Sequence, residues 1–203
     1  MRTAKIILAA GILLLAAGMV GTVINWMWSR EARGTSETVL AEIEKINDGS
    51  VSAYKDGYAA ADRAGEALSA YKKREYFTID GVDYIGVLAV PSLELTLPVA
   101  AELNYEYLRQ SPCRYSGSAE ENSLIIAAHN YKSQFGDIDR LDPGAEVLFS
   151  DPNGNVYRYE VTGLDTVEPD STEGLLAGTW DMTLFTCTPG GSRRLALRCT
   201  KTE

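Results

Sequence analysis

The chain has 203 residues, of which 45% are hydrophobic and 23% charged, and its formal net charge is -9. This composition is typical of a folded protein and excludes an intrinsically disordered chain. We expect no nucleic-acid partner either, because phosphate binding depends on clustered Lys and Arg side chains, and the sequence contains no such cluster.

The first predicted element is a membrane-spanning helix at residues 6–29. This range contains no charged residue, and a helix needs about 20 apolar residues to cross a bilayer core. A cleaved signal peptide is the alternative, but its apolar region is only about 7 to 15 residues long. Trp26 and Trp28 are typical interfacial anchors. We therefore expect a cytoplasmic tail at residues 1–5 and a single-pass cell-membrane protein whose remaining residues lie on the extracellular face.

Residues 30–78 predict a helical stalk. Ser36, Val39, Leu40 and Ile43 suggest a short helix, which a break at residues 47–50 follows. Beyond the break, apolar residues recur at steps of three and four, as on one face of an amphipathic helix: Val51, Tyr54, Tyr58, Ala61, Gly65, Leu68 and Tyr71. We expect this face to pack on a second domain at residues 79–203, and a docking surface for a partner is the alternative.

Residues 79–203 predict a mainly β domain with short helices. Short apolar runs are separated by Pro, Gly, Asp and Asn, which favours a closed barrel or a sandwich. A brief helix is expected at residues 103–108, a hairpin turn at residues 151–154, and a long loop at residues 165–181. The expected strands are residues 84–90, 93–99, 123–129, 146–150, 156–164, 182–187 and 194–199.

His129 is the only histidine in the chain, so thiol-imidazole chemistry can use only this ring. It ends one predicted strand, and Cys187 ends another. A hairpin formed by residues 182–187 and 194–199 would place Arg194 opposite Cys187. An imidazole or a guanidinium favours the thiolate, and the same groups can supply a proton and stabilise an oxyanion. The sequence therefore predicts an enzyme with a cysteine nucleophile.

The stretch from Thr183 to Cys187, followed by Arg194, resembles the signature of sortases, the membrane-anchored cysteine transpeptidases of mainly Gram-positive bacteria. Residues 84–91 with 97–99 are similar to the opening strands of that family, and residues 122–130 to its histidine strand. The resemblance covers about residues 84–201. It implies an eight-stranded sortase-type β-barrel that follows the transmembrane helix and the stalk.

The resemblance also implies a function: cleavage of a C-terminal sorting signal similar to LPXTG. Cys187 would form a thioacyl intermediate, His129 would act as acid and then as base, and Arg194 would hold the signal and the oxyanion. Thr186 would line the substrate groove. The implied partners are surface or pilin proteins that carry the signal, and an amine acceptor such as a lipid-linked peptidoglycan precursor or a pilin lysine.

Two features of the resemblance leave alternatives. Arg193 precedes Arg194, and a shift of one residue in a strand turns a side chain to the opposite face; the run from Arg194 to Arg198 favours Arg194. Subclass features are mixed. Cys187 to Pro189 resembles pilin-polymerising members of class C, whereas His129 to Lys132 and the long N-terminal helices resemble class B.

Other readings of the same residues remain. A hydrolytic cysteine peptidase would use the same three side chains, with water resolving the thioester, and a membrane-tethered scaffold would leave Cys187 inert. A zinc site would need Cys113, His129, Cys187 and Cys199, although no Cys-x-x-Cys pair is present. Cys113 and Cys199 could instead form a disulfide or simply be buried. We expect no cofactor and no obligatory metal, and calcium stimulation through loop carboxylates has no ligand spacing to support it.

Overall fold

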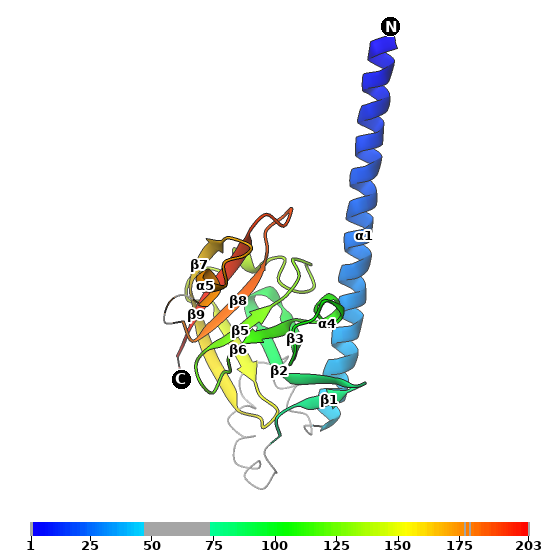
Figure 1. Ribbon diagram of the computed structural model, residues 1–203. Helices are drawn as coiled ribbons and strands as arrows, with labels where there is room; N and C mark the ends of the chain where they lie inside the picture. Colours follow the sequence, from blue (N-terminus) through cyan, green and yellow to red (C-terminus); the bar gives the residue numbers. More distant parts are fainter. Residues whose placement is uncertain (1, 47–73, 177, 179, 203) are drawn as a thin grey trace.

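A computed structural model describes residues 2–46, 74–176, 178 and 180–202. The amphipathic face predicted between Val51 and Tyr71, and the break at residues 47–50, lie outside these residues. The described chain forms one long N-terminal helix and a β-barrel beside its C-terminal end (Figure 1).

Helix α1 runs without interruption over Arg2–Ile46. The sequence instead predicted a membrane helix followed by a separate short one. Residues 30–46 continue the helix because they contain no proline and include four Glu, and the lone Gly34 is tolerated within it. From Ile7 onward the helix has an 18-residue window of mean hydropathy 2.5 with none of it buried in the protein, so by length and composition it can cross a membrane. The domain boundaries at residues 6, 30 and 79 remain predictions.

The helix end packs on the barrel. Val39, Leu40 and Ile43 are buried against β1 (Phe77–Ile79) and neighbouring strands. At the end of the apolar segment, the Ser29 hydroxyl donates to the Ser133 hydroxyl at 3.0 Å. The C-terminal part of α1 is therefore packed into the folded domain.

Nine strands and four short helical turns follow α1 in the described chain. The short helical elements are η1 (Pro91–Leu93), α4 (Tyr105–Gln110), η2 (Ile138–Arg140) and α5 (Thr172–Leu176). The strands after β1 are β2 (Val82–Val90), β3 (Leu95–Ala100), β4 (Cys113–Ser116), β5 (Leu124–Ala127), β6 (Glu146–Ser150), β7 (Val156–Val167), β8 (Met182–Cys187) and β9 (Arg194–Lys201).

The strands form a closed barrel. Their order is β1-β2-β3-β4-β5-β8-β9-β7-β6, and β2 also pairs with β6. Eight strands thus close the circle, with β1 added to β2 as a hairpin arm. This confirms the predicted eight-stranded barrel, and β6 and β8 have the predicted bounds. The hairpin between β6 and β7 also lies where the turn at residues 151–154 predicted it.

Two strands were missed. β4 has the sequence Cys-Arg-Tyr-Ser, which is too short and polar to show an apolar alternation. β1 joins β2 through Asp80 and Gly81, both with positive φ (49° and 79°). Such an Asp-Gly pair is a strong hairpin signal that could have revealed β1. This hairpin crosses the predicted boundary at residue 79.

Barrel closure depends on Gly86 in β2. Its φ is 150°, and a Cβ built there would lie 2.0 Å from the carbonyl oxygen of Ser150 in β6. Only glycine allows the two backbones to approach this closely. The register of β2 against β3 also shifts here, between Tyr84 and Gly86.

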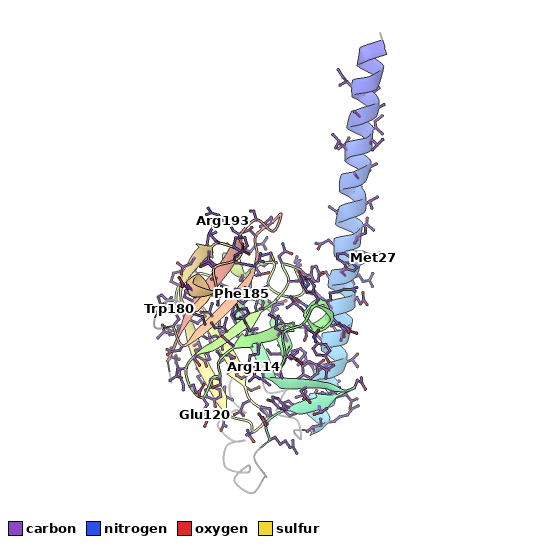
Figure 2. The ribbon with its side chains drawn as sticks, viewed as in Figure 1. Met27, Arg114, Glu120, Trp180, Phe185 and Arg193 are labelled. Carbon is purple, nitrogen blue, oxygen red and sulfur yellow. The ribbon has the colours of Figure 1, made fainter. Side chains whose placement is uncertain are left out.

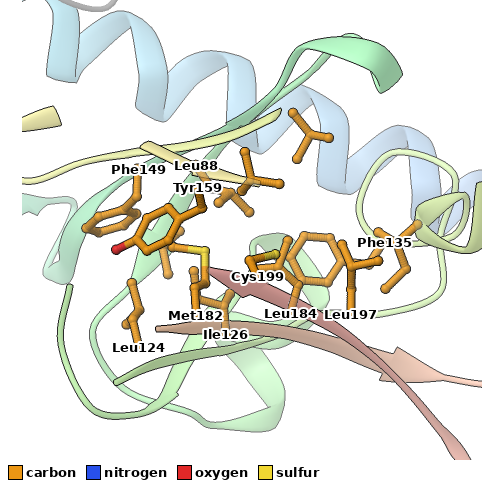
Figure 3. Close-up of a cluster of buried hydrophobic side chains, with 14 of the residues drawn as sticks. Leu88, Leu124, Ile126, Phe135, Phe149, Tyr159, Met182, Leu184, Leu197 and Cys199 are labelled. Atoms are coloured by element: carbon orange, nitrogen blue, oxygen red, sulfur yellow. The ribbon is translucent and has the colours of Figure 1, made fainter. Parts of the chain in front are cut away.

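Side chains from all of the barrel's longer strands fill its interior (Figure 3). Tyr159 has no exposed surface and lies in the same cluster as Phe149, Leu124 and Met182. Its hydroxyl has no hydrogen-bond partner among the described residues. A buried hydroxyl without a partner costs free energy, and desolvation also raises the pKa of Tyr159 well above its usual range.

We therefore expect Tyr159→Phe to leave the free energy of unfolding unchanged or to raise it by up to about 1 kcal/mol, because the ring keeps its packing. Leu184→Ala in the same core is the matched control and should lose about 2–5 kcal/mol. Thermal unfolding of the detergent-solubilised full chain, followed by circular dichroism, measures both. A clear loss of stability in Tyr159→Phe would mean that the hydroxyl is bonded.

Candidate functional site

Strand β8 presents two faces, because successive side chains of a strand point in opposite directions. Met182 and Leu184 belong to the barrel interior. Phe185 lies on the outside, in a cluster with Ile125 and Ala127 of β5. Cys187 follows two residues after Phe185 and therefore lies on the outer face, at the end of the strand.

The register of β5 places His129 beside Cys187. The strands are parallel, and Ala127 is the Cα partner of Phe185. The pairing continues past the end of β5, since the Ala128 N–H donates to the Phe185 carbonyl at 3.0 Å. At the same offset, His129 comes opposite Cys187, on the outer face.

Arg194 lies on the other side of Cys187. It is the first residue of β9, and its Cα partner in β8 is Cys187. Directly opposed residues in an antiparallel pair share a face. Within the described chain, the Arg194 guanidinium forms no ion pair and one long hydrogen bond, to the Arg193 carbonyl at 3.5 Å. Most of its donors are therefore available to a ligand.

Arg193 is placed differently. It precedes β9, at the turn after Gly190 and Gly191, and is visible at that turn in Figure 2. Its guanidinium forms an exposed ion pair with Glu168 at 2.9 Å, and the backbone N–H of Arg193 donates to the Thr188 hydroxyl at 3.0 Å. The structure thus brings three residues together in a row: His129 follows the end of β5, Cys187 ends β8 and Arg194 begins β9.

Thr186 lies beneath this row. It is buried, with 2% of its surface exposed, and its hydroxyl donates to the Ala128 carbonyl at 2.8 Å. That bond ties the end of β5 to β8, between the residues that precede His129 and Cys187. The observed role is structural, and direct contact of Thr186 with a substrate stays a prediction.

His129 is held through both its ring and its backbone. It stacks on Tyr131, with ring centroids 4.7 Å apart. The backbone N–H of His129 donates to the side-chain oxygen of Gln134 at 2.8 Å, and the Gln134 amide nitrogen donates to the Leu108 carbonyl at 3.4 Å. The ring atom Nε2 is buried without a hydrogen-bond partner in the described chain.

The electrostatic surroundings favour a neutral imidazole. Burial lowers the pKa of His129, and the positive charge of Arg109 lowers it further. A neutral ring can accept a proton from a thiol, and a ring with a lowered pKa is a readier proton donor once charged.

An apolar surface adjoins the row. Ile125, Ala127, Phe185 and Ala196 form it, and Leu175 of α5 packs against it. These five side chains form the outer-face cluster, and each has at most 8% of its surface exposed. The ring of Tyr115 from β4 packs edge to face on that of Phe185, with ring centroids 5.3 Å apart.

The other two cysteines are separate from the site. Cys113 and Cys199 are buried, and all three cysteines are free thiols, so the structure does not contain the Cys113–Cys199 disulfide considered above. Burial raises the pKa of each of these two thiols to about 12, which keeps them protonated and unreactive. Among the described residues, no group of three or more His, Cys, Asp or Glu side chains is placed to hold a metal.

Sequence reasoning missed the residues that support His129. Tyr131 and Gln134 follow it closely, but no spacing rule marks a stacking ring or a bridging amide. Arg109 lies in α4, and only the tertiary structure brings it near the imidazole.

Comparisons with known proteins agree with this geometry. The sortase-domain family model matches residues 88–202, more than half of the chain. Sortase A of Bacillus anthracis is 27% identical to this chain, with 66% of this chain and 77% of that protein covered.

Solved structures show the same fold. Sortase C of Streptococcus pneumoniae superposes with a TM-score of 0.57 at 19% identity, covering 82% of this chain and 97% of that one. Sortase A from Corynebacterium diphtheriae gives 0.55 at 16% identity, with 91% and 96% covered. With the family match and the barrel in agreement, the chain belongs to the sortase family and is a sortase-type cysteine transpeptidase.

Proposed function

We propose that this enzyme cleaves an LPXTG-like C-terminal sorting signal and transfers the preceding protein to an amine. The observation that carries the proposal is the row of His129, Cys187 and Arg194 at the ends of three adjacent strands. A thiol flanked by an imidazole and a guanidinium has the groups that acyl transfer needs on either side of the reacting carbonyl.

In the first step the Cys187 sulfur attacks the carbonyl carbon of the scissile amide. The thiol proton passes to the imidazole of His129, a bond forms between sulfur and carbon, and the negative charge moves to the carbonyl oxygen. When the carbon–nitrogen bond breaks, the imidazolium gives its proton to the departing amine. A thioester on Cys187 and a free amine result.

The second step reverses these transfers. An incoming amine attacks the thioester, His129 removes the proton that the amine loses, and the sulfur leaves and regains a proton. The new amide carries the acyl group, and Cys187 is restored. His129 thus acts as acid in one half-reaction and as base in the other.

Arg194 would stabilise the oxyanion of both tetrahedral intermediates. Its guanidinium shares a face with Cys187 and has donors free for a ligand. A fixed cation in this position acts on charge that develops only during the reaction, which lowers the barrier rather than merely binding the substrate.

The membrane helix suggests where the reaction takes place. Figure 1 shows the β8–β9 turn at the barrel end toward which the apolar part of α1 extends. A single-pass anchor with the barrel on the extracellular face would hold the site close to the bilayer. The proposed partners are surface or pilin proteins that bear the sorting signal, and a lipid-linked precursor or a pilin lysine as amine. We propose no obligatory metal or other cofactor.

The first prediction concerns the covalent intermediate. Full-length protein in detergent is incubated with peptides Leu-Pro-X-Thr-Gly in which X is varied, and intact-mass spectrometry follows the chain. We expect a thioacyl adduct on Cys187, and none in Cys187→Ala. Added amines such as triglycine should convert the adduct to a transpeptidation product.

Two results would contradict this reading. If Cys187→Ala still cleaves the peptides, the nucleophile is wrong. If water resolves the adduct at the same rate in the presence and absence of every amine tested, the enzyme is a hydrolytic peptidase.

The second prediction concerns the protonation of His129. Because it is the only histidine, its ring C2 proton gives one NMR signal whose titration reports its pKa directly. We expect a midpoint below the ordinary value of about 6.5, and an upward shift in Arg109→Gln, which removes one of the two causes of the lowering.

Stability should depend on pH through the same ring. Since the folded pKa lies below the unfolded one, the neutral ring's contribution is present above about pH 6.5 and is lost as the pH falls toward the folded pKa. A midpoint in the folded protein at or above the unfolded value would contradict the placement of His129.

The third prediction separates the two arginines. Arg194→Gln should lower kcat/KM by about 10²–10³, as loss of an oxyanion donor does. Arg193→Gln removes only an exposed ion pair and should stay within about threefold of wild type. Peptide cleavage rates measure both variants, and the reverse order would assign the role to Arg193.

A further inference from the structure

A second arginine lies on the same outer face, deeper along β9. Arg198 is only 2% exposed, and its Cα partner in β8 is Thr183. Arg194 and Arg198 point to one side because they are four residues apart in a strand, with Ala196 of the apolar cluster between them. The mechanism above does not use Arg198.

Its guanidinium makes four hydrogen bonds, and two of them go to one segment. Nη1 donates to the Leu175 carbonyl at 2.9 Å and to the Thr183 hydroxyl at 3.1 Å. Nη2 donates to the Gly174 carbonyl at 2.5 Å. Nε pairs with the Asp165 carboxylate at 2.9 Å. Two of these acceptors are backbone carbonyls of α5.

Apart from the packing of Leu175, helix α5 has little other support. It has five residues, and an isolated helix of that length is unstable in water. One further contact comes from β4, where the Tyr115 hydroxyl lies 3.5 Å from that of Thr172. The carbonyls at the end of α5 would be unpaired without Arg198, so this side chain fixes the segment to the barrel wall.

The fixed segment covers the surface beside the nucleophile. Leu175, whose carbonyl Arg198 binds, is buried against Phe185 and Ala196. Phe185 comes two residues before Cys187 on the same face of β8. The position of α5 thus sets how much of the apolar cluster is available to a chain bound next to Cys187.

We propose that Arg198 is a positioning residue for substrate binding: it clamps α5 over the outer-face cluster and so shapes the groove that receives the peptide. The proposal rests on the proposed function, because it names the element that selects the signal at the same site. Arg198 does not touch the reacting atoms, so its loss should act on KM more than on kcat.

Lysine cannot replace this clamp. A guanidinium spreads five donors over a plane and can serve four acceptors at once, whereas an ammonium has three donors at one point. We therefore expect graded behaviour, with Arg198→Lys intermediate between wild type and Arg198→Met.

The test uses the full chain in detergent and two readouts. Hydrogen exchange of the α5 amides should be faster in Arg198→Met, while exchange in β5 and β8 stays unchanged. With the Leu-Pro-X-Thr-Gly peptide that reacts best, KM should rise at least about fivefold, with kcat within about twofold. Lys201→Met, which removes one positive charge from the same strand away from α5, is the matched control and should change neither readout.

Unchanged exchange and unchanged KM in Arg198→Met would overturn the proposal. So would an equal fall in kcat and in the rate of Cys187 alkylation, since Arg198 would then act on the nucleophile. If Arg198→Met does not fold, Arg198→Lys decides by the same two readouts. If no peptide reacts with the wild type, the proposed function fails, while exchange at α5 still decides whether the clamp exists.

Discussion

The parallel pairing of β5 with β8 is the constraint on which the site depends. Its register brings the only histidine of the chain beside Cys187, although 57 residues separate them in sequence. Backbone hydrogen bonds fix this register, and the Thr186 hydroxyl strengthens it at the strand ends by binding Ala128. A slip of one residue would turn His129 or Cys187 toward the core and remove it from the row. Barrel closure at Gly86 supports the same register from the opposite wall, because a closed sheet leaves no edge strand free to shift.

The three thiols and the one imidazole differ in burial, and burial affects the pKa and the accessibility of each group. Cys113 and Cys199 lie in apolar clusters that raise the pKa of each to about 12, so they remain neutral core residues. Cys187 is only partly buried, at the barrel rim, where a substrate can reach it. His129 lies between these extremes. Burial lowers the pKa of His129, which favours the neutral ring, and the ring stacks on Tyr131, while Gln134 binds the backbone N–H of His129. Reactivity is thus set by depth in the barrel as much as by residue type.

The sequence predicted those parts of the fold and site that depend on local pattern. The apolar runs of β6 and β8 gave their bounds, and the turn between β8 and β9 paired Arg194 with Cys187. The placement of His129 next to Cys187 could not be derived in this way, because the order of strands in a sheet is not encoded locally; the family resemblance supplied it. The roles of Arg109 and Gln134 were not predicted for the same reason. β4 escaped because its four residues lack an apolar alternation, and its place is set by Ala100 and the neighbouring strand β5.

Anchor and site form one structural unit. The last polar residue of the apolar segment, Ser29, bonds to Ser133 in the loop that follows His129. One helical turn farther on, Ala32 is buried, and Ser36 donates to the Gln110 carbonyl at the end of α4. α4 in turn carries Arg109, whose charge acts on His129, and Leu108, whose carbonyl binds Gln134. The helix that can cross the membrane therefore packs on the elements that hold the imidazole. Tilting α1 relative to the barrel would strain these contacts, so the direction of the helix and the geometry of the site are mechanically linked.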